Sequence, residues 1–330
     1  MSQHQMVLFE EDEGPKWFNS PVTFHEGTLT DILQYIPDFD RQDFALGNRP
    51  DLPTQQTLAN ARLDMIIRKP FGTEKELIPI GVVSKDYVLV KHAEIIESAT
   101  KALNQFTIKP EDVKADLTIT EYGERMALSI YLPEKYTFDP GDGKKLAMRL
   151  EFVNSVDGST RFRTMMGWFR FVCSNGLVIG VTQAEIRRRH MGDLNLGDVG
   201  SVLSSGLERA ESEKENFRKW REKRVSADRL RSWVDVDKEL KDTWGFKAAA
   251  RAYHIARTGH DVEIVGQYKD RMPTTIETTQ ARRVPGSPVP SKNLFDISQV
   301  LAWLAKERRD VQEQLEWREQ IPEILKPLMN

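Results

Sequence analysis

The sequence predicts an α+β protein: an antiparallel β-meander sheet with covering helices, followed by a mainly helical C-terminal half. Residues 146–181 alternate apolar and polar side chains, and two turn sequences interrupt them, Asp157-Gly158-Ser159 and Cys173-Ser174-Asn175-Gly176. Asp-Gly and Asn-Gly between β-prone runs are the strongest short-range signal for a hairpin. After residue 198 the apolar residues recur mostly at spacings of three and four, which is typical of amphipathic helices.

The expected sheet combines this meander with a second hairpin and strands nearer the N-terminus. Alternating apolar residues on both sides of Tyr122-Gly123-Glu124 predict the second hairpin. Strands are expected at 61–68, 78–90, 116–121, 125–132, 146–152, 162–172 and 177–181.

Helices are expected where apolar residues keep a helical spacing between capping and stop residues. Asp198 and Asn293 are the candidate N-caps, Gly259 is a C-terminal stop, and Pro322 is expected to break the closing helix. The expected helices are 92–106, 199–220, 227–242, 243–258 and 293–321, with a short basic helix or turn at 183–190.

These patterns divide the chain into four parts. Residues 1–55 are interrupted by prolines and are expected to be poorly ordered or irregular, and residues 56–260 form the α+β core domain. Residues 261–292, which end in a Pro-rich stretch, are expected to be a connector. A C-terminal helix is expected at 293–330.

Composition is that of a water-soluble globular protein. The chain has 330 residues, a formal net charge of −3 and one cysteine. An internal disulfide is therefore impossible, and the acidic N-terminal stretch does not resemble a signal peptide. No apolar run approaches the roughly 20 residues that span a bilayer. We expect a cytoplasmic protein that has no contact with membranes.

The sequence carries no motif of a known catalytic or cofactor site. The six histidines are scattered, and HExxH, paired-cysteine, P-loop, dinucleotide-binding and GxSxG patterns are all missing. We therefore expect no catalytic residue, no cofactor and no transition metal, although a magnesium site built from distant carboxylates stays open. Cys173 has apolar neighbours and is expected to be a buried structural thiol.

The candidate functional residues are arginines of the meander. Between residues 161 and 191, six arginines stand against one glutamate, for a local charge of +5 in a chain of −3. Aromatic residues lie between them, and such a pattern suits single-stranded DNA, because guanidinium groups contact phosphates while rings stack on bases. The expected nucleic-acid-binding residues are Arg161, Arg163, Arg170, Arg187, Arg188 and Arg189.

Three other interpretations stay open. Strand alternation mixes rings and charges on both faces, so the aromatics also fit a sheet core. A long charged helix at 199–224 and the tail helix could serve a protein-interaction or regulatory (anti-defence) factor. A metal-dependent nucleic-acid enzyme is the third. The chain is also expected to form a homo-oligomer if it binds DNA.

The meander resembles a known family. Met148-Arg149-Leu150, Asn154-Ser155 and Asp157-Gly158-Ser159, followed by residues 170–177, are similar to the central signature of the phage/plasmid-like proteins known as domain of unknown function 932. The resemblance extends from about residue 84 to about 256. It implies an origin in a mobile genetic element and brings no established activity.

The order of strands and helices is also similar to the layout of single-strand annealing proteins of phages, which implies a role in annealing, recombination or replication.

Overall fold

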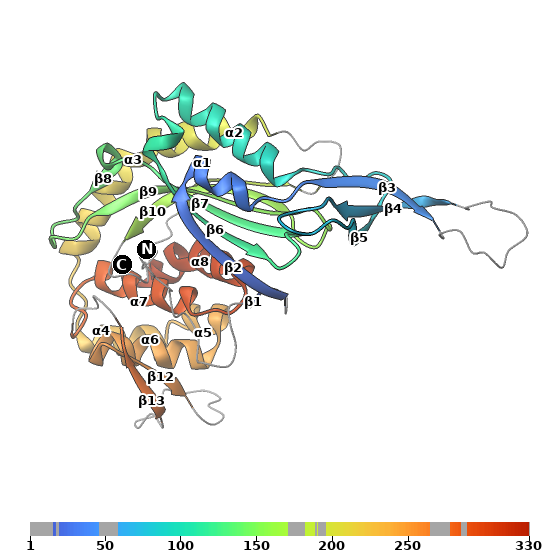
Figure 1. The fold of residues 1–330 in the computed structure, drawn as a ribbon. Coiled ribbons are helices and arrows are strands. Elements are labelled where there is room, and N and C mark those ends of the chain that lie inside the picture. Colours follow the sequence, from blue (N-terminus) through green and yellow to red (C-terminus); the bar gives the residue numbers. More distant parts are fainter. Residues whose placement is uncertain are drawn as a thin grey trace, which may run out of the picture.

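The computed structural model describes residues 16–17, 20–45, 59–170, 182–188, 190, 196–264, 278–284 and 289–329. Within these residues the strands form antiparallel sheets, and helices dominate from residue 198 onward (Figure 1). The predicted α+β class is therefore confirmed. No helix in the described part of the chain is both long and apolar enough to cross a bilayer.

The large sheet has eight strands among the described residues. Strand β8 (Thr137–Phe138) pairs with β9, and the others follow one another in the order β1 (Lys16–Trp17), β2 (Ser20–Thr28), β6 (Lys114–Thr120), β7 (Arg125–Tyr131), β9 (Leu146–Ser155), β10 (Phe162–Arg170) and β11 (Thr182–Arg188). Every pair is antiparallel.

The first hairpin of the predicted meander is confirmed. Strands β9 and β10 are joined by Asp157-Gly158-Ser159, where Gly158 has a φ of +79° and the Asp157 carboxylate accepts the Ser159 amide at 2.9 Å. The hairpin of β6 and β7 is confirmed as well. The turn at 173–176 and the strand at 177–181 lie outside the described residues.

The prediction of a basic helix or turn at 183–190 is wrong. Residues Thr182–Arg188 form β11, which pairs with β10 along most of its length. An open strand edge offers unpaired backbone groups, and pairing with that edge outweighs a weak local helical preference.

A separate sheet of three strands projects from one end of the large sheet (Figure 1). It consists of β3 (Phe39–Ala45), β4 (Ala59–Arg68) and β5 (Ile78–Ser84). Residues 86–90, predicted as strand, are not in a strand, although Tyr87 and Val90 are buried. Helix α1 (Leu29–Ile32) follows β2, and short 3₁₀ helices occur at Leu33–Tyr35, Pro110–Asp112 and Glu134–Tyr136.

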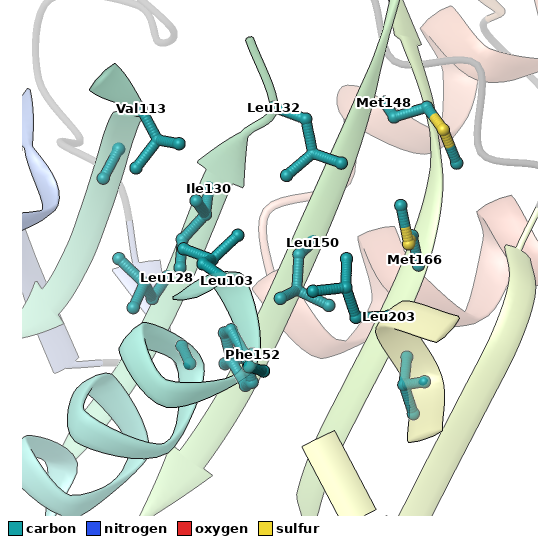
Figure 2. Packing of buried hydrophobic residues seen from close by; sticks show 14 of the residues in the cluster. Leu103, Val113, Leu128, Ile130, Leu132, Met148, Leu150, Phe152, Met166 and Leu203 are labelled. Atoms are coloured by element: carbon teal, nitrogen blue, oxygen red, sulfur yellow. The ribbon is translucent and has the colours of Figure 1, made fainter. Parts of the chain in front are cut away.

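Helices cover both faces of the large sheet. Helices α2 (His92–Gln105) and α3 (Asp198–Glu222) pack on one face, where Leu103 and Leu203 join Leu150 of the sheet in one buried cluster (Figure 2). Helix α8 (Val311–Met329) covers the opposite face. The alternation of β10 follows this division: Phe162, Met166 and Trp168 join the core under α2 and α3, whereas Met165 packs against Leu315 of α8.

The C-terminal half builds a second core. It contains α4 (Ala227–Asp235), α5 (Glu239–Trp244), α6 (Phe246–Thr258), α7 (Leu294–Lys306) and α8, with a hairpin of β12 (His260–Ile264) and β13 (Thr278–Arg283). Helix α7 is central, since every residue from Leu294 to Ala305 is buried. Elements thus occur in both segments expected to be irregular or connecting, with β2, α1 and β3 in 1–55 and the hairpin in 261–292.

Helix boundaries agree with the sequence in part. Asn293 caps α7 as predicted, because its side chain accepts the Asp296 amide at 2.9 Å. The helix predicted at 243–258 is divided at Gly245, which has a φ of +85°. The predicted break at Pro322 is wrong, and α8 runs through it to Met329. Burial of Ile321 and Ile324 beside that proline stabilises the helix across it.

A glycine of α3 sets how closely that helix approaches the sheet. A Cβ at Gly206 would lie 2.3 Å from the Met166 sulfur and 3.1 Å from the Met166 Cβ, whereas one at Gly200 would meet only the Gln105 Oε1 at 3.4 Å. We expect Gly206→Ala to lower the free energy of unfolding by about 1–2 kcal/mol through overpacking. Gly200→Ala, the matched control, should raise it by about 0.5–1 kcal/mol through helix propensity. Urea unfolding measures both, and equal effects would contradict this packing.

Candidate nucleic-acid interface

The structure buries two of the arginines predicted to contact phosphates. Arg163 is 1% exposed and forms an ion pair with Glu319 of α8, and Arg170 is 2% exposed and forms an ion pair with Asp142. Arg161 is exposed just before β10. The two guanidinium groups on β10 therefore attach the sheet to other elements, and contact with phosphate would require these ion pairs to open.

The remaining predicted arginines are placed only in part. Arg187 and Arg188 lie in β11, where the backbone register sets Arg187 opposite Arg163. Their side chains and the whole of Arg189 lie outside the described residues. Among the rings between the arginines, Phe162 and Trp168 are each 1% exposed and Phe169 is 3% exposed, while Phe171 lies outside the described residues. The three described rings belong to the core in this conformation and offer no face to a nucleic-acid base.

Ionic groups are concentrated between the sheet and α8. We name this group the sheet–α8 cluster: Arg149, Glu151, Arg163, Arg318 and Glu319. Glu151 pairs with Arg149 beside it and accepts from Arg318 Nη1 at 3.0 Å. Burial opposes ionisation of Glu151, but the charges of Arg149 and Arg318 outweigh it and lower its pKa.

The cluster continues along the sheet toward Asp116. The Tyr131 hydroxyl donates to the Asp116 carboxylate, and the guanidinium of Arg149 lies 4.7 Å from the centre of the Phe169 ring. Burial raises the pKa of Asp116 to about 6, which the Tyr131 hydrogen bond offsets only in part. The arginines and carboxylates of the cluster compensate one another's charge. Their ion pairs hold the large sheet and α8 together.

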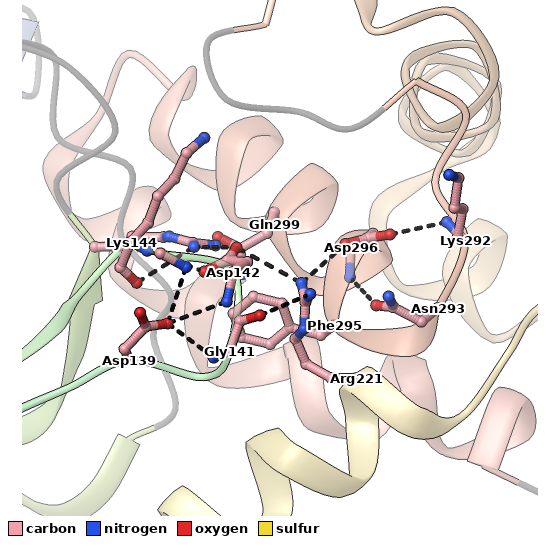
Figure 3. Close-up of polar contacts among 12 residues, drawn as sticks. Asp139, Gly141, Asp142, Lys144, Arg221, Lys292, Asn293, Phe295, Asp296 and Gln299 are labelled. Atoms are coloured by element: carbon pink, nitrogen blue, oxygen red, sulfur yellow. Dashed lines mark hydrogen bonds and ion pairs between the residues drawn. The ribbon is translucent and has the colours of Figure 1, made fainter.

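A second polar junction lies around Asp142 (Figure 3). Asp142 accepts from Arg170 and lies 3.6 Å from Nη1 of Arg221 in α3. The Phe295 ring of α7 lies 5.3 Å from the Arg170 guanidinium and 5.8 Å from that of Arg221. The Asp139 carboxylate shapes the loop by accepting the amides of Gly141, Asp142 and Gly143. This junction joins β10, α3 and α7 and buries the Arg170 guanidinium.

Asn154 of the family signature is structural as well. Its amide donates to the Val90 carbonyl at 2.9 Å and to His92 Nδ1 at 3.0 Å, so the His92 proton is on Nε2, which donates to the Gly123 carbonyl at 2.9 Å. Complete burial lowers the pKa of His92 to about 4. Among the described residues, no three His, Cys, Asp or Glu side chains are arranged to hold a metal ion.

A cationic surface lies elsewhere, on α6 and the hairpin that follows it. Helix α6 carries three lysine or arginine residues and no carboxylate in 13 residues. Strand β13 ends in two exposed arginines. We name the cations of these two elements the cationic face: Lys247, Arg251, Arg257, Arg282 and Arg283.

One buried carboxylate holds the parts of the cationic face together. Asp261 of β12 is 4% exposed and accepts from Arg251 at 2.9 and 2.6 Å and from the Trp303 indole at 2.8 Å. Arg282 Nη2 lies 3.7 Å from the same carboxylate, and its guanidinium lies 5.0 Å from the Trp303 ring centre. Helix, hairpin and α7 therefore form one rigid base for the exposed cations.

The sequence did not predict this face, because its arginines are densest in the meander, between residues 161 and 191. The usable signal was the lack of carboxylates: Phe246–Thr258 contains none, in a chain with 50 Asp and Glu residues. A helix with one apolar side and cations as its only charged residues points to an anionic partner.

Glu151 should be the most sensitive position of the sheet–α8 cluster. Glu151→Gln removes the charge that two buried guanidinium groups share, so we expect a loss of about 3–5 kcal/mol in the free energy of unfolding. The control Glu211→Gln, at an exposed carboxylate on α3, should change it by less than about 0.5 kcal/mol. Denaturant unfolding measures both, and a small effect at Glu151 would show that the cluster is not tightly coupled.

His92 should make stability depend on pH. Its pKa is lowered from 6.5 to about 4, so the folded chain binds fewer protons than the unfolded chain between these values. The free energy of unfolding should therefore fall as pH drops from 6.5 toward 4, by on the order of 2–3 kcal/mol more than in His92→Gln. The matched variant His260→Gln, at an exposed histidine, should keep the wild-type slope. Parallel curves for all three proteins would contradict this assignment.

Comparisons with known proteins place the chain in a family. The chain is 39% identical to the UPF0380 proteins YfjQ and YafZ of Escherichia coli (strain K12) over 56 residues, which is 17% of this chain and 19% of each relative. The chain thus spans about a fifth of the length of these curated relatives, and no solved structure matches it. A family model matches residues 79–281, more than half of the chain. The protein therefore belongs to the family described as Domain of unknown function (DUF932).

Proposed function

We propose that this protein binds nucleic acid through the cationic face and acts as an accessory protein without a catalytic centre of its own. The observation that carries the proposal is a helix with three cationic residues and no carboxylate, fixed beside two exposed arginines of β13. Phosphates attract such a surface, and release of their counterions drives binding. The chain as a whole has a net charge of −3, so the attraction must come from this local surface.

The sequence prediction of single-stranded DNA and of a phage or plasmid role belongs to the same proposal. It rests on the resemblance to phage and plasmid proteins and to annealing proteins, and on the arginine-rich meander. Of the meander arginines whose side chains are described, Arg161 alone is exposed, while Arg163 and Arg170 are ion-paired. The cationic face supports the proposal better, because Lys247, Arg257 and Arg283 are exposed, while Arg251 and Arg282 are paired with Asp261 and Glu307.

The alternative role in protein interaction has less support. The charges on the long helix α3 neutralise one another, as in the pairs of Lys214 with Glu211 at 2.6 Å and of Arg218 with Glu215 at 3.4 Å. Such a mixed surface is typical of a solvated helix face.

Fluorescence anisotropy with labelled oligonucleotides tests the proposal. Lys247→Glu combined with Arg257→Glu should weaken binding at least about tenfold at low salt and make the salt dependence less steep, because two phosphate-directed cations are lost. Arg218→Glu combined with Lys219→Glu, on exposed positions of α3, makes the same change in net charge and should leave most of the affinity.

The outcomes separate the two surfaces. If both double variants lose the same affinity, net charge alone explains the effect. The cationic face would then not be the binding site. Loss in Arg161→Glu alone would move the site to the start of β10, as the sequence predicted. Failure of the wild-type protein to bind any oligonucleotide at low salt would remove the proposal altogether.

A further inference from the structure

From the contacts of two buried histidines, we infer that acid releases the three-stranded sheet of β3, β4 and β5 from the large sheet by protonating His92 and His190. We name residues 87–91, which join β5 to α2, the β5–α2 linker. Both histidines hold this linker against the large sheet, so their protonation state decides whether it stays attached. The inference does not depend on the proposed function.

The three-stranded sheet packs on the large sheet through a small apolar core. Its buried members are Phe39, Ile66, Val83, Tyr87 and Val156. Tyr87 belongs to the β5–α2 linker, and its hydroxyl donates to the Ser155 carbonyl of β9 at 3.0 Å. A part of a protein that buries little apolar surface opens at a smaller cost in free energy than the whole chain unfolds. Displacement of the linker removes Tyr87 from this core and so favours opening at this place.

His92 holds the end of the linker through Asn154 of β9. The Asn154 amide nitrogen donates to the Val90 carbonyl at 2.9 Å and to His92 Nδ1 at 3.0 Å, while His92 Nε2 donates to the Gly123 carbonyl at 2.9 Å. A second proton on His92 would go to Nδ1 and face the NH₂ group of Asn154, so two donors would meet. Asn154 must then turn its amide oxygen toward His92, and its NH₂ group leaves the Val90 carbonyl. Protonation of His92 therefore breaks the bond that holds Val90.

His190 holds the beginning of the linker. Its carbonyl accepts the Val88 amide at 3.0 Å, and its Nδ1 donates to the Val88 carbonyl at 3.2 Å. The ring stacks on Tyr87, with 5.0 Å between the ring centres. His190 is 5% exposed, and its Nε2 has no hydrogen-bond partner among the described residues. A proton on that nitrogen would be poorly solvated, so the charged ring is favoured only after the linker moves away.

The charged groups that face the two rings do not remove this preference. Burial lowers the pKa of His92 to about 4 and also lowers the pKa of His190. The charge of His190 lowers the pKa of His92 further, whereas Asp157 raises both. Asp157 is itself paired with Arg125 at 3.2 Å, and burial raises the pKa of Tyr87, so that ring stays neutral. Attachment is therefore strongest above the ordinary histidine pKa of 6.5 and weakens as pH falls toward 4.

The linker moves together with the three-stranded sheet. The Arg41 guanidinium of β3 donates to the carbonyls of Tyr87 and Lys85 at 2.6 and 2.5 Å, and the Lys85 amide donates to the Arg62 carbonyl of β4 at 2.9 Å. These bonds do not involve the large sheet. Acid therefore opens the contact between the two sheets and leaves the strands of the smaller sheet paired.

Amide hydrogen exchange of the full chain, resolved to single amides, measures the release. From pH 6.5 to about pH 4.5, the protection of the Val88 amide should fall at least about tenfold after correction for intrinsic exchange, because opening returns the pKa of His92 from about 4 to 6.5. The Leu132 amide, which donates to the Met148 carbonyl of β9 at 2.9 Å, should change less than about threefold. The Lys85 amide should stay protected.

Glutamine in place of each histidine keeps a donor and an acceptor but cannot gain a proton. His92→Gln combined with His190→Gln should therefore keep the Val88 amide protected at about pH 4.5, a result that a misfolded variant cannot produce. The matched variant His260→Gln, at an exposed histidine, should lose protection as the wild type does.

Three results would overturn the inference. Equal loss of protection at Val88 and Leu132 would show that acid unfolds the whole chain. A Val88 amide that stays protected in the wild type would show that no release occurs. Release that persists unchanged in the double variant would exclude the two histidines as its cause. The wild-type comparison of the two amides needs no variant, so it decides the release even if the double variant fails to fold.

Discussion

Burial of both faces of the large sheet is the constraint on which the rest of the structure depends. Helices α2 and α3 cover one face with apolar side chains, and α8 covers the other. The second face carries Arg149 and Arg163, whose charges cannot be buried without partners. Glu151 and Glu319 supply those partners, so the C-terminal helix is electrostatically part of the sheet.

This constraint decides where function can lie. Arginines that look like a phosphate-binding track in the sequence become internal ion pairs, because α8 and the loop at 139–144 bring carboxylates to them. A buried pair contributes little net stability, but loss of one partner is costly, so such residues tolerate little change. The proposed nucleic-acid contacts therefore lie outside the two cores, on exposed cations of α6 and β13.

The family signature has the same character. Asn154 orders the chain around Val90 and His92, and Asp157 closes the β9–β10 turn and pairs with Arg125 at 3.2 Å. Arg149 lies in the sheet–α8 cluster. These residues specify how the sheet is built.

The sequence by itself determined the features that depend on neighbouring residues. Turn chemistry predicted the hairpins at Asp157-Gly158 and at Gly123, helical spacing predicted α2 and α3, and Asn293 predicted the start of α7, because these signals act within a few residues. Alternation also separated the two faces of β10. It could not say what covers each face: the partner of Arg163 lies 156 residues away, and β11 forms only because β10 offers an edge. Whether an arginine is a surface cation or a buried ion pair was therefore decided by tertiary structure, since exposure depends on what packs against a strand and is invisible in the strand's own residues.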